Sequence, residues 1–88
     1  MEQGPGSWSK FECLTPEDKA VFDAVKMPLG VAYEPVAVKR QLVSGMNYDF
    51  LCNAKVVYPD AQWYVATVLV YKPLDADPVV VKINKCDC

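Results

Sequence analysis

The sequence predicts an α+β roll, in which one helix packs across an antiparallel sheet of four to five strands. Two features lead to this class: a capped helix start at Thr15 with apolar residues at helical spacing behind it, and four later runs rich in strand-forming residues. Because the helix and the sheet each have one apolar side to bury, they should pack against each other. The 88 residues suit a single domain, which we expect to span residues 1–88.

The helix is expected to begin after Thr15 and to end around residues 27–29. Thr15 can cap the first turn, Pro16 sits where its missing N–H costs nothing, and Asp18 stands three residues after the cap, close to capping-box spacing. The apolar stripe of this helix is expected to consist of Ala20, Val21, Ala24 and Val25. Phe22 is expected at the margin of that stripe.

Four strands are expected at residues 31–43, 47–57, 63–72 and 79–83. The second run alternates most clearly, and one of its faces would be formed by Tyr48, Phe50, Cys52, Ala54 and Val56. The turns between the runs are expected at Ser44-Gly45, 59–62 and 73–77. A short fifth strand over Ser9–Cys13 is a further expectation.

Charge and composition narrow the classes of function. The chain has 9 basic and 11 acidic side chains, which argues against binding to nucleic acid, and no apolar stretch approaches the ~20 residues of a membrane span. It contains no histidine, which excludes Ser–His and Cys–His nucleophiles and histidine-ligated metals. We therefore expect a binding protein that is not an enzyme and that uses no metal and no cofactor.

The cysteines Cys13, Cys52, Cys86 and Cys88 contain no C-x-x-C pair, so they do not form a metal-binding pattern. Cys52 alternates with Tyr48 and Phe50 and should be a buried apolar side chain. Since no secretory segment is visible, we expect reduced thiols and a cytoplasmic protein. A redox-responsive dimer through the C-terminal cysteines is a weaker alternative.

The order of the hairpins predicts a binding edge. In an antiparallel meander consecutive turns alternate between the two ends of the sheet, so the turns at Ser44-Gly45 and 73–77 should lie at the same end. Residues 1–8 are expected to form a flexible lead, and residues 85–88 a flexible tail. If Ser9–Cys13 pairs with the first strand, the lead also emerges at the end that carries these two turns.

The run Gln41-Leu42-Val43-Ser44-Gly45 matches the Gln-x-Val-x-Gly motif of the cystatins, which inhibit papain-like cysteine proteases. The agreement continues into Met46-Asn47-Tyr48 and extends upstream to Tyr33–Val38. Gly6–Ser9, followed by Thr15-Pro16-Glu17, resembles the N-terminus of the stefin branch. The chain as a whole therefore resembles a stefin, and the resemblance implies a cystatin-like roll.

The resemblance implies a reversible, tight-binding inhibitor that fills the active-site cleft of a papain-like protease with the N-terminal segment and two hairpin loops. The residues that match the contact positions of the family, together with their neighbours in the lead and the second loop, are Gly6, Ser7, Trp8, Gln41, Leu42, Val43, Ser44, Gly45, Pro73 and Leu74. A monomer is expected, with a strand-exchanged (domain-swapped) dimer as an alternative, since stefins can open at the first hairpin.

Simpler interpretations remain open. Gly45 could merely supply the positive φ of an ordinary hairpin. Trp8 could fold back on the body of the protein as readily as it could contact a partner. The alternative for the whole chain is a cystatin-fold interaction module that inhibits no protease and binds a partner through the open sheet face or an edge strand.

Overall fold

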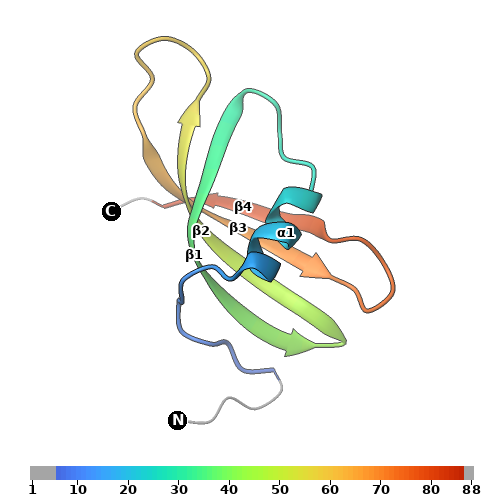
Figure 1. Ribbon diagram of the computed structural model, residues 1–88. Helices are drawn as coiled ribbons and strands as arrows, with labels where there is room; N and C mark the ends of the chain where they lie inside the picture. The colour runs from blue at the N-terminus through green and yellow to red at the C-terminus, as the bar shows by residue number, and fades with distance from the viewer. Residues whose placement is uncertain (1–5, 87–88) are drawn as a thin grey trace.

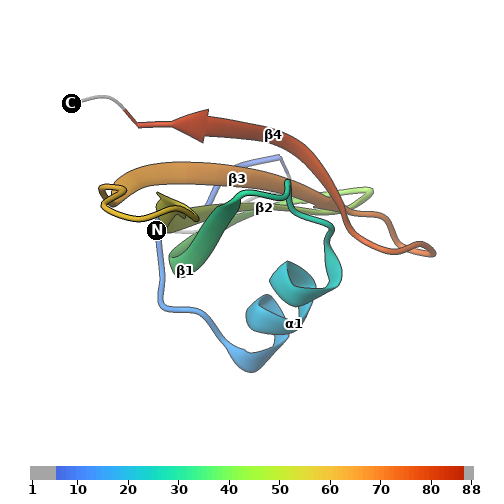
Figure 2. The ribbon, with the colours of Figure 1, turned by 90° about the horizontal axis from the view of Figure 1, so that it is seen from above.

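The computed structural model describes residues 6–86 and confirms an α+β fold in which one helix packs against a four-stranded antiparallel sheet (Figure 1). The elements in chain order are α1 (Pro16–Ala24), β1 (Val31–Val43), β2 (Gly45–Val56), β3 (Tyr64–Lys72) and β4 (Val79–Lys85). The strands lie in the order β1-β2-β3-β4, and every neighbouring pair is antiparallel. Viewed from above, α1 lies on one side of the sheet (Figure 2).

The helix begins as the sequence predicts but ends earlier. Thr15 and Asp18 form a complete capping box, with Pro16 in the first turn. The predicted end near residues 27–29 is wrong, because Val25 already has an extended backbone, with φ −86° and ψ 152°, and buries its side chain. No helix within residues 6–86 is long and apolar enough to span a membrane.

The buried face of α1 differs from the predicted stripe. Asp18 and Phe22 are its buried positions, and Val25 is buried directly after its end, whereas Ala20 and Ala24 are exposed. Phe22 lies at the centre of the core and contacts Phe50 edge to face, with ring centroids 5.0 Å apart. The expectation that Phe22 lies at the margin is therefore wrong. The helix turns the side that contains Asp18 and Phe22 toward the sheet, and the pattern of apolar residues does not reveal that an aspartate is buried there.

β2 follows the predicted alternation: Phe50, Cys52 and Ala54 are fully buried, and Phe50 and Cys52 belong to the same core cluster as Phe22 of α1. β2 begins at Gly45, two positions before the predicted start, because Val43 and Gly45 already pair across the turn. The connection between β1 and β2 is therefore Ser44 alone, rather than the predicted Ser44-Gly45.

The N-terminal segment pairs with β1 but does not form the expected fifth strand. It makes two isolated bridges with β1, Trp8 with Gln41 and Glu12 with Val38. Between them the backbone N–H of Arg40 donates to the Ser9 hydroxyl (2.9 Å) instead of to a carbonyl. The side-chain acceptor interrupts the backbone ladder, so the segment remains irregular.

Both ends of the described chain are attached to the sheet. Residues 1–8 were expected to form a flexible lead, and Gly6 and Trp8 of this stretch are paired with β1. Lys85 closes β4, and the N–H of Cys86 donates to the carbonyl of Val65 (2.8 Å), so these two residues continue the sheet rather than a tail. The other residues of both expectations, 1–5 and 87–88, lie outside the described residues.

Candidate functional site

The structure brings the three predicted segments to one end of the sheet, which we call the rim: residues 6–8, 41–45 and 73–74. The β1–β2 and β3–β4 turns lie at the same end in Figure 1, and the β2–β3 connection lies at the opposite end. The N–H of Gly6 donates to the carbonyl of Leu42 (3.0 Å), which holds the N-terminal segment beside the first hairpin. The rim is thus formed by segments far apart in sequence.

Gly45 joins the two hairpins by its lack of a side chain. Its φ is +105°, a conformation that L residues with side chains rarely adopt. A methyl group on its Cα would overlap the carbonyl oxygen of Lys72 and lie 3.1 Å from the Cα of Pro73. Gly45 therefore does supply the positive φ of a turn, and it also allows the second hairpin to approach the first.

Tyr71 makes a second tie between the hairpins, which the sequence analysis did not identify. Its hydroxyl donates to the carbonyl of Ser44 at 2.5 Å, so β3 holds the turn that follows β1. Ser44 is an exposed turn residue, and this bond fixes the backbone at the middle of the rim. The sequence gives little indication of this hydrogen bond, because a tyrosine at the end of a strand is usually expected to pack its ring on the face of the sheet.

Gln41 connects the first hairpin to the N-terminal segment through its side chain. Its Nε2 donates to the carbonyl of Gly6 (2.9 Å), and its Oε1 accepts from Nδ2 of Asn47 (2.8 Å). Gln41 and Asn47 are paired across β1 and β2 in the sheet register. The predicted contact residue Gln41 thus has both ends of its amide engaged within the protein.

The rim exposes large apolar side chains. Leu42 and Val43 are 54% and 38% exposed, and Leu74 in the second turn is 73% exposed. Ser7 and Ser44 are also exposed, whereas Pro73 is half-buried against the first hairpin. An edge that combines exposed apolar groups with a fixed backbone is suited to binding rather than to chemistry.

Trp8 folds back on the sheet rather than extending from the rim. The ammonium of Lys39 lies 5.2 Å from the centre of the Trp8 ring and 5.3 Å from that of Phe11. The same ammonium is 4.0 Å from Asp49 on β2. Each cation–π contact contributes about 0.5–1 kcal/mol at such a site, so Lys39 also holds the N-terminal segment.

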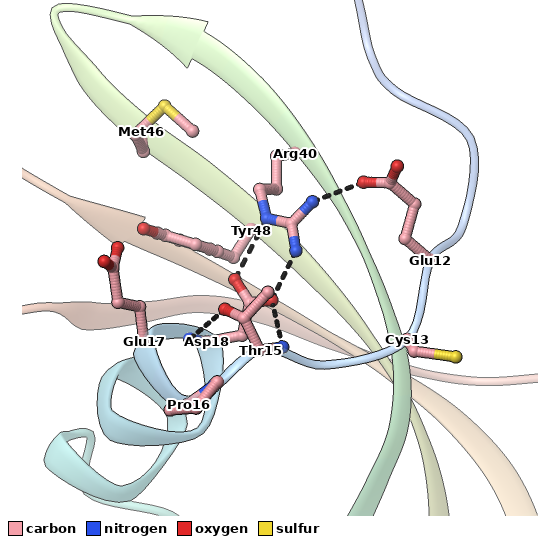
Figure 3. Close-up of a pocket in the computed structure, with 9 residues that line it drawn as sticks. All are labelled: Glu12, Cys13, Thr15, Pro16, Glu17, Asp18, Arg40, Met46 and Tyr48. Atoms are coloured by element: carbon pink, nitrogen blue, oxygen red, sulfur yellow. Dashed lines mark hydrogen bonds and ion pairs between the residues drawn. The ribbon is translucent and has the colours of Figure 1, made fainter.

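Arg40 is the charged centre behind the rim and was missed as a key residue. Its guanidinium donates through Nε to Asp18 Oδ1 (2.9 Å), and it forms ion pairs with Asp18 and Glu12 (Figure 3). Arg40 on β1 thereby joins the start of α1 and the N-terminal segment. The side chains of Asp18 and Arg40 are only 3% and 22% exposed, so this pairing is largely removed from water.

The pKa of the Asp18 carboxyl is below its ordinary value. Burial raises it, but the hydrogen bonds from Arg40 and from Thr15 outweigh that effect. Arg40 in turn has a raised pKa, mainly because its side chain donates to Asp18. The charged carboxylate therefore stabilises the fold above pH 3.8, its ordinary pKa, and this stabilisation is lost as the pH falls through the lower folded value.

A shallow pocket of about 580 Å³ lies between the start of α1 and β2, next to the rim. Its lining residues are Glu12, Cys13, Thr15, Pro16, Glu17, Asp18, Arg40, Met46 and Tyr48 (Figure 3). Arg40 is already paired there with Glu12 and Asp18, so its charge holds the N-terminal segment and α1 against β1 and is not free for a ligand.

The thiol of Cys52 is not an activated nucleophile. Cys52 is fully buried, and burial raises its pKa to about 12, so the thiol stays protonated at neutral pH. Cys13 and Cys86 are free thiols as well. Within residues 6–86, no three His, Cys, Asp or Glu side chains are grouped so that they could hold a metal ion.

Comparison of the sequence with models of protein families gave no match, and comparison with curated proteins gave none either.

Proposed function

We propose that this protein is a reversible, tight-binding inhibitor of papain-like cysteine proteases that blocks the active-site cleft with its N-terminal segment and two hairpin loops. The observation that carries the proposal is the convergence at the rim of Gly6, the Val43–Gly45 turn and Pro73-Leu74. The sequence resembles the stefins in two of these segments, at Gly6 and in the Gln41–Gly45 run, and Pro73-Leu74 occupies the position of their second hairpin with a different sequence. The sequence motif and the position of the three segments in the fold therefore both support protease inhibition.

The binding energy would come from burial of the exposed apolar groups of the rim. Leu42, Val43 and Leu74 each expose a substantial part of their side chain, and full burial of such a group contributes about 1.5–3 kcal/mol. The backbone beneath them is held by Gly45 and Tyr71, so little conformational freedom is lost on binding. The inhibitor would act by occlusion, without a covalent bond to the thiolate of the protease.

We also propose that the protein is not an enzyme, that it is a monomer and that it is cytoplasmic. Cys13, Cys52 and Cys86 are free thiols, as a reducing compartment requires. The rim is complete within one chain, since all three of its segments come from the same molecule. A second copy is therefore not needed to build the binding edge.

Steady-state inhibition of papain, with a small peptide as substrate, tests the proposal. We expect a competitive pattern and essentially complete inhibition at micromolar protein, because the rim and the substrate would occupy the same cleft. A heat-unfolded, cysteine-blocked sample of the same chain serves as the control. Unchanged papain activity at micromolar concentrations of the folded protein would count decisively against the function.

The alternative is an interaction module that inhibits no protease and binds a partner through the open face of the sheet. It is favoured by Val65 and Val79, which are 40% and 51% exposed on strands β3 and β4. In that case the binding of the partner would be insensitive to substitutions at the rim and would be lost when Val65 is replaced by a charged residue. Leu42→Glu at the rim and Val65→Glu on the sheet face, compared in one binding assay, separate the two functions.

A further inference from the structure

The amide of Gln41 lies between two groups whose chemistry fixes its orientation. The carbonyl of Gly6 only accepts hydrogen bonds, so the side of the amide that faces it, at 2.9 Å, must be the Nε2 donor. The Oε1 acceptor then faces Asn47 and receives a hydrogen bond from its Nδ2 (2.8 Å). Asn47 therefore holds the Gln41 amide in the one orientation that can bind Gly6.

Gly6 is thereby held on both sides of its backbone. Its N–H donates to the carbonyl of Leu42 (3.0 Å), and its own carbonyl accepts from Gln41. The next ties to β1 come at Trp8, which bridges to Gln41, and at Ser9, whose N–H donates to the carbonyl of Arg40 (2.8 Å). The two bonds at Gly6 thus extend the ordered part of the segment as far as the rim.

We propose that Gln41 and Asn47 form a latch, a pair of positioning residues that orders the N-terminal segment at Gly6 against the first hairpin. The importance of the latch for inhibition rests on the function proposed above; its effect on Gly6 does not. Gln41 thus has a role different from the direct contact that the family resemblance implies. Its amide is engaged with Gly6 and Asn47 instead of being directed at a target.

The latch matters because ordering a backbone residue costs conformational free energy that binding must otherwise supply. A segment already seated at the rim enters a cleft with less loss of freedom than a mobile one. The bond to Gly6 is exposed to solvent, so its own contribution is that of one ordinary hydrogen bond. The expected effect on affinity is accordingly about fivefold to tenfold.

The substitution Asn47→Asp tests the latch without altering Gln41. The introduced carboxylate cannot donate to Oε1, and it draws Nε2 toward itself, so that the amide presents oxygen to the carbonyl of Gly6. Asn53→Asp is the matched control, because residue 53 lies on the same strand and on the same face of it and undergoes the same change of charge. Both variants are compared in the full chain and in a chain that lacks residues 1–7.

The first readout is amide hydrogen exchange of Gly6, measured by NMR in the free protein. We expect exchange to be at least about fivefold faster in Asn47→Asp than in wild type and unchanged in Asn53→Asp. Equal protection of Gly6 in wild type and Asn47→Asp overturns the latch, whatever the inhibition assay shows. This readout requires no protease, so it decides the latch even if the proposed function fails.

The second readout is the inhibition constant against papain. Asn47→Asp should weaken inhibition about fivefold to tenfold in the full chain and should have no effect once residues 1–7 are removed, because the latch then has nothing to hold. An equal effect in both chains means that the charge acts directly on the protease and contradicts the positioning role. Faster exchange at Gly6 with unchanged inhibition by the full chain confirms that the latch orders Gly6 and contradicts its importance for inhibition.

Discussion

Gly45→Ala is expected to weaken inhibition of papain by about 100-fold, or ~3 kcal/mol of binding free energy, while the protein stays folded. The added methyl group would overlap the carbonyl oxygen of Lys72, so the first and second hairpins must move apart. This movement changes the spacing between Leu42 and Val43 in the first hairpin and Leu74 in the second. The measurement is the inhibition constant, alongside urea unfolding to verify the fold.

Gly30→Ala provides a matched control for this variant. Gly30 also has a positive φ, +91°, but its added methyl would meet nothing within 4 Å. It precedes β1 at the end of the strand opposite the rim. Both variants should lose about 1–2 kcal/mol of stability through backbone strain, but only Gly45→Ala should lose inhibition. If the two variants inhibit equally well, the approach of the hairpins does not matter for binding.

Arg40→Ala is expected to cause the largest loss of stability, about 3 kcal/mol at neutral pH. The substitution leaves the buried carboxylate of Asp18 without its charged partner and releases Glu12, so that α1 and the N-terminal segment both lose their tie to β1. Lys39→Ala, next to it on the same strand, removes an ion pair at 4.0 Å and two cation–π contacts near the surface, and it should cost about 1–2 kcal/mol. Urea unfolding of the two variants gives both values.

The dependence on pH identifies the cause of the Arg40→Ala effect. In the wild type the charged form of Asp18 stabilises the fold above its ordinary pKa of 3.8, and that stabilisation disappears as the carboxyl is protonated at lower pH. The difference between wild type and Arg40→Ala should therefore be largest at about pH 7 and shrink toward about pH 3. A difference that is the same at both pH values would mean that the arginine acts through packing of its side chain and not through Asp18.

The fold class and the strand pattern were predictable because they depend on local periodicity. The alternation in β2 placed Phe50 and Cys52 in the core, and the capping box at Thr15 marked the start of α1. The phase of the helix was not predictable from apolar residues alone. Its buried face contains Asp18, whose burial depends on Arg40, 22 residues away in the sequence.

The candidate site was also predictable only in part. Its backbone geometry follows from the motif and from the alternation of hairpins, so the convergence of the three segments could be anticipated. The hydrogen bonds of Gln41 and Tyr71 could not be anticipated, since their partners, Gly6 and Ser44, are distant in sequence and accept through backbone carbonyls that any residue carries. Such contacts depend on the tertiary arrangement and leave no local signature.

The proposed function requires that the rim occupy the active-site cleft of a papain-like protease. Calorimetric titration of the protein into papain, before and after the cleft is filled with a covalent peptidyl inhibitor, tests this requirement. We predict 1:1 binding to the free enzyme and none to the filled enzyme, because the two ligands compete for one space. Equal binding to both forms of papain, or binding to neither, would contradict the account.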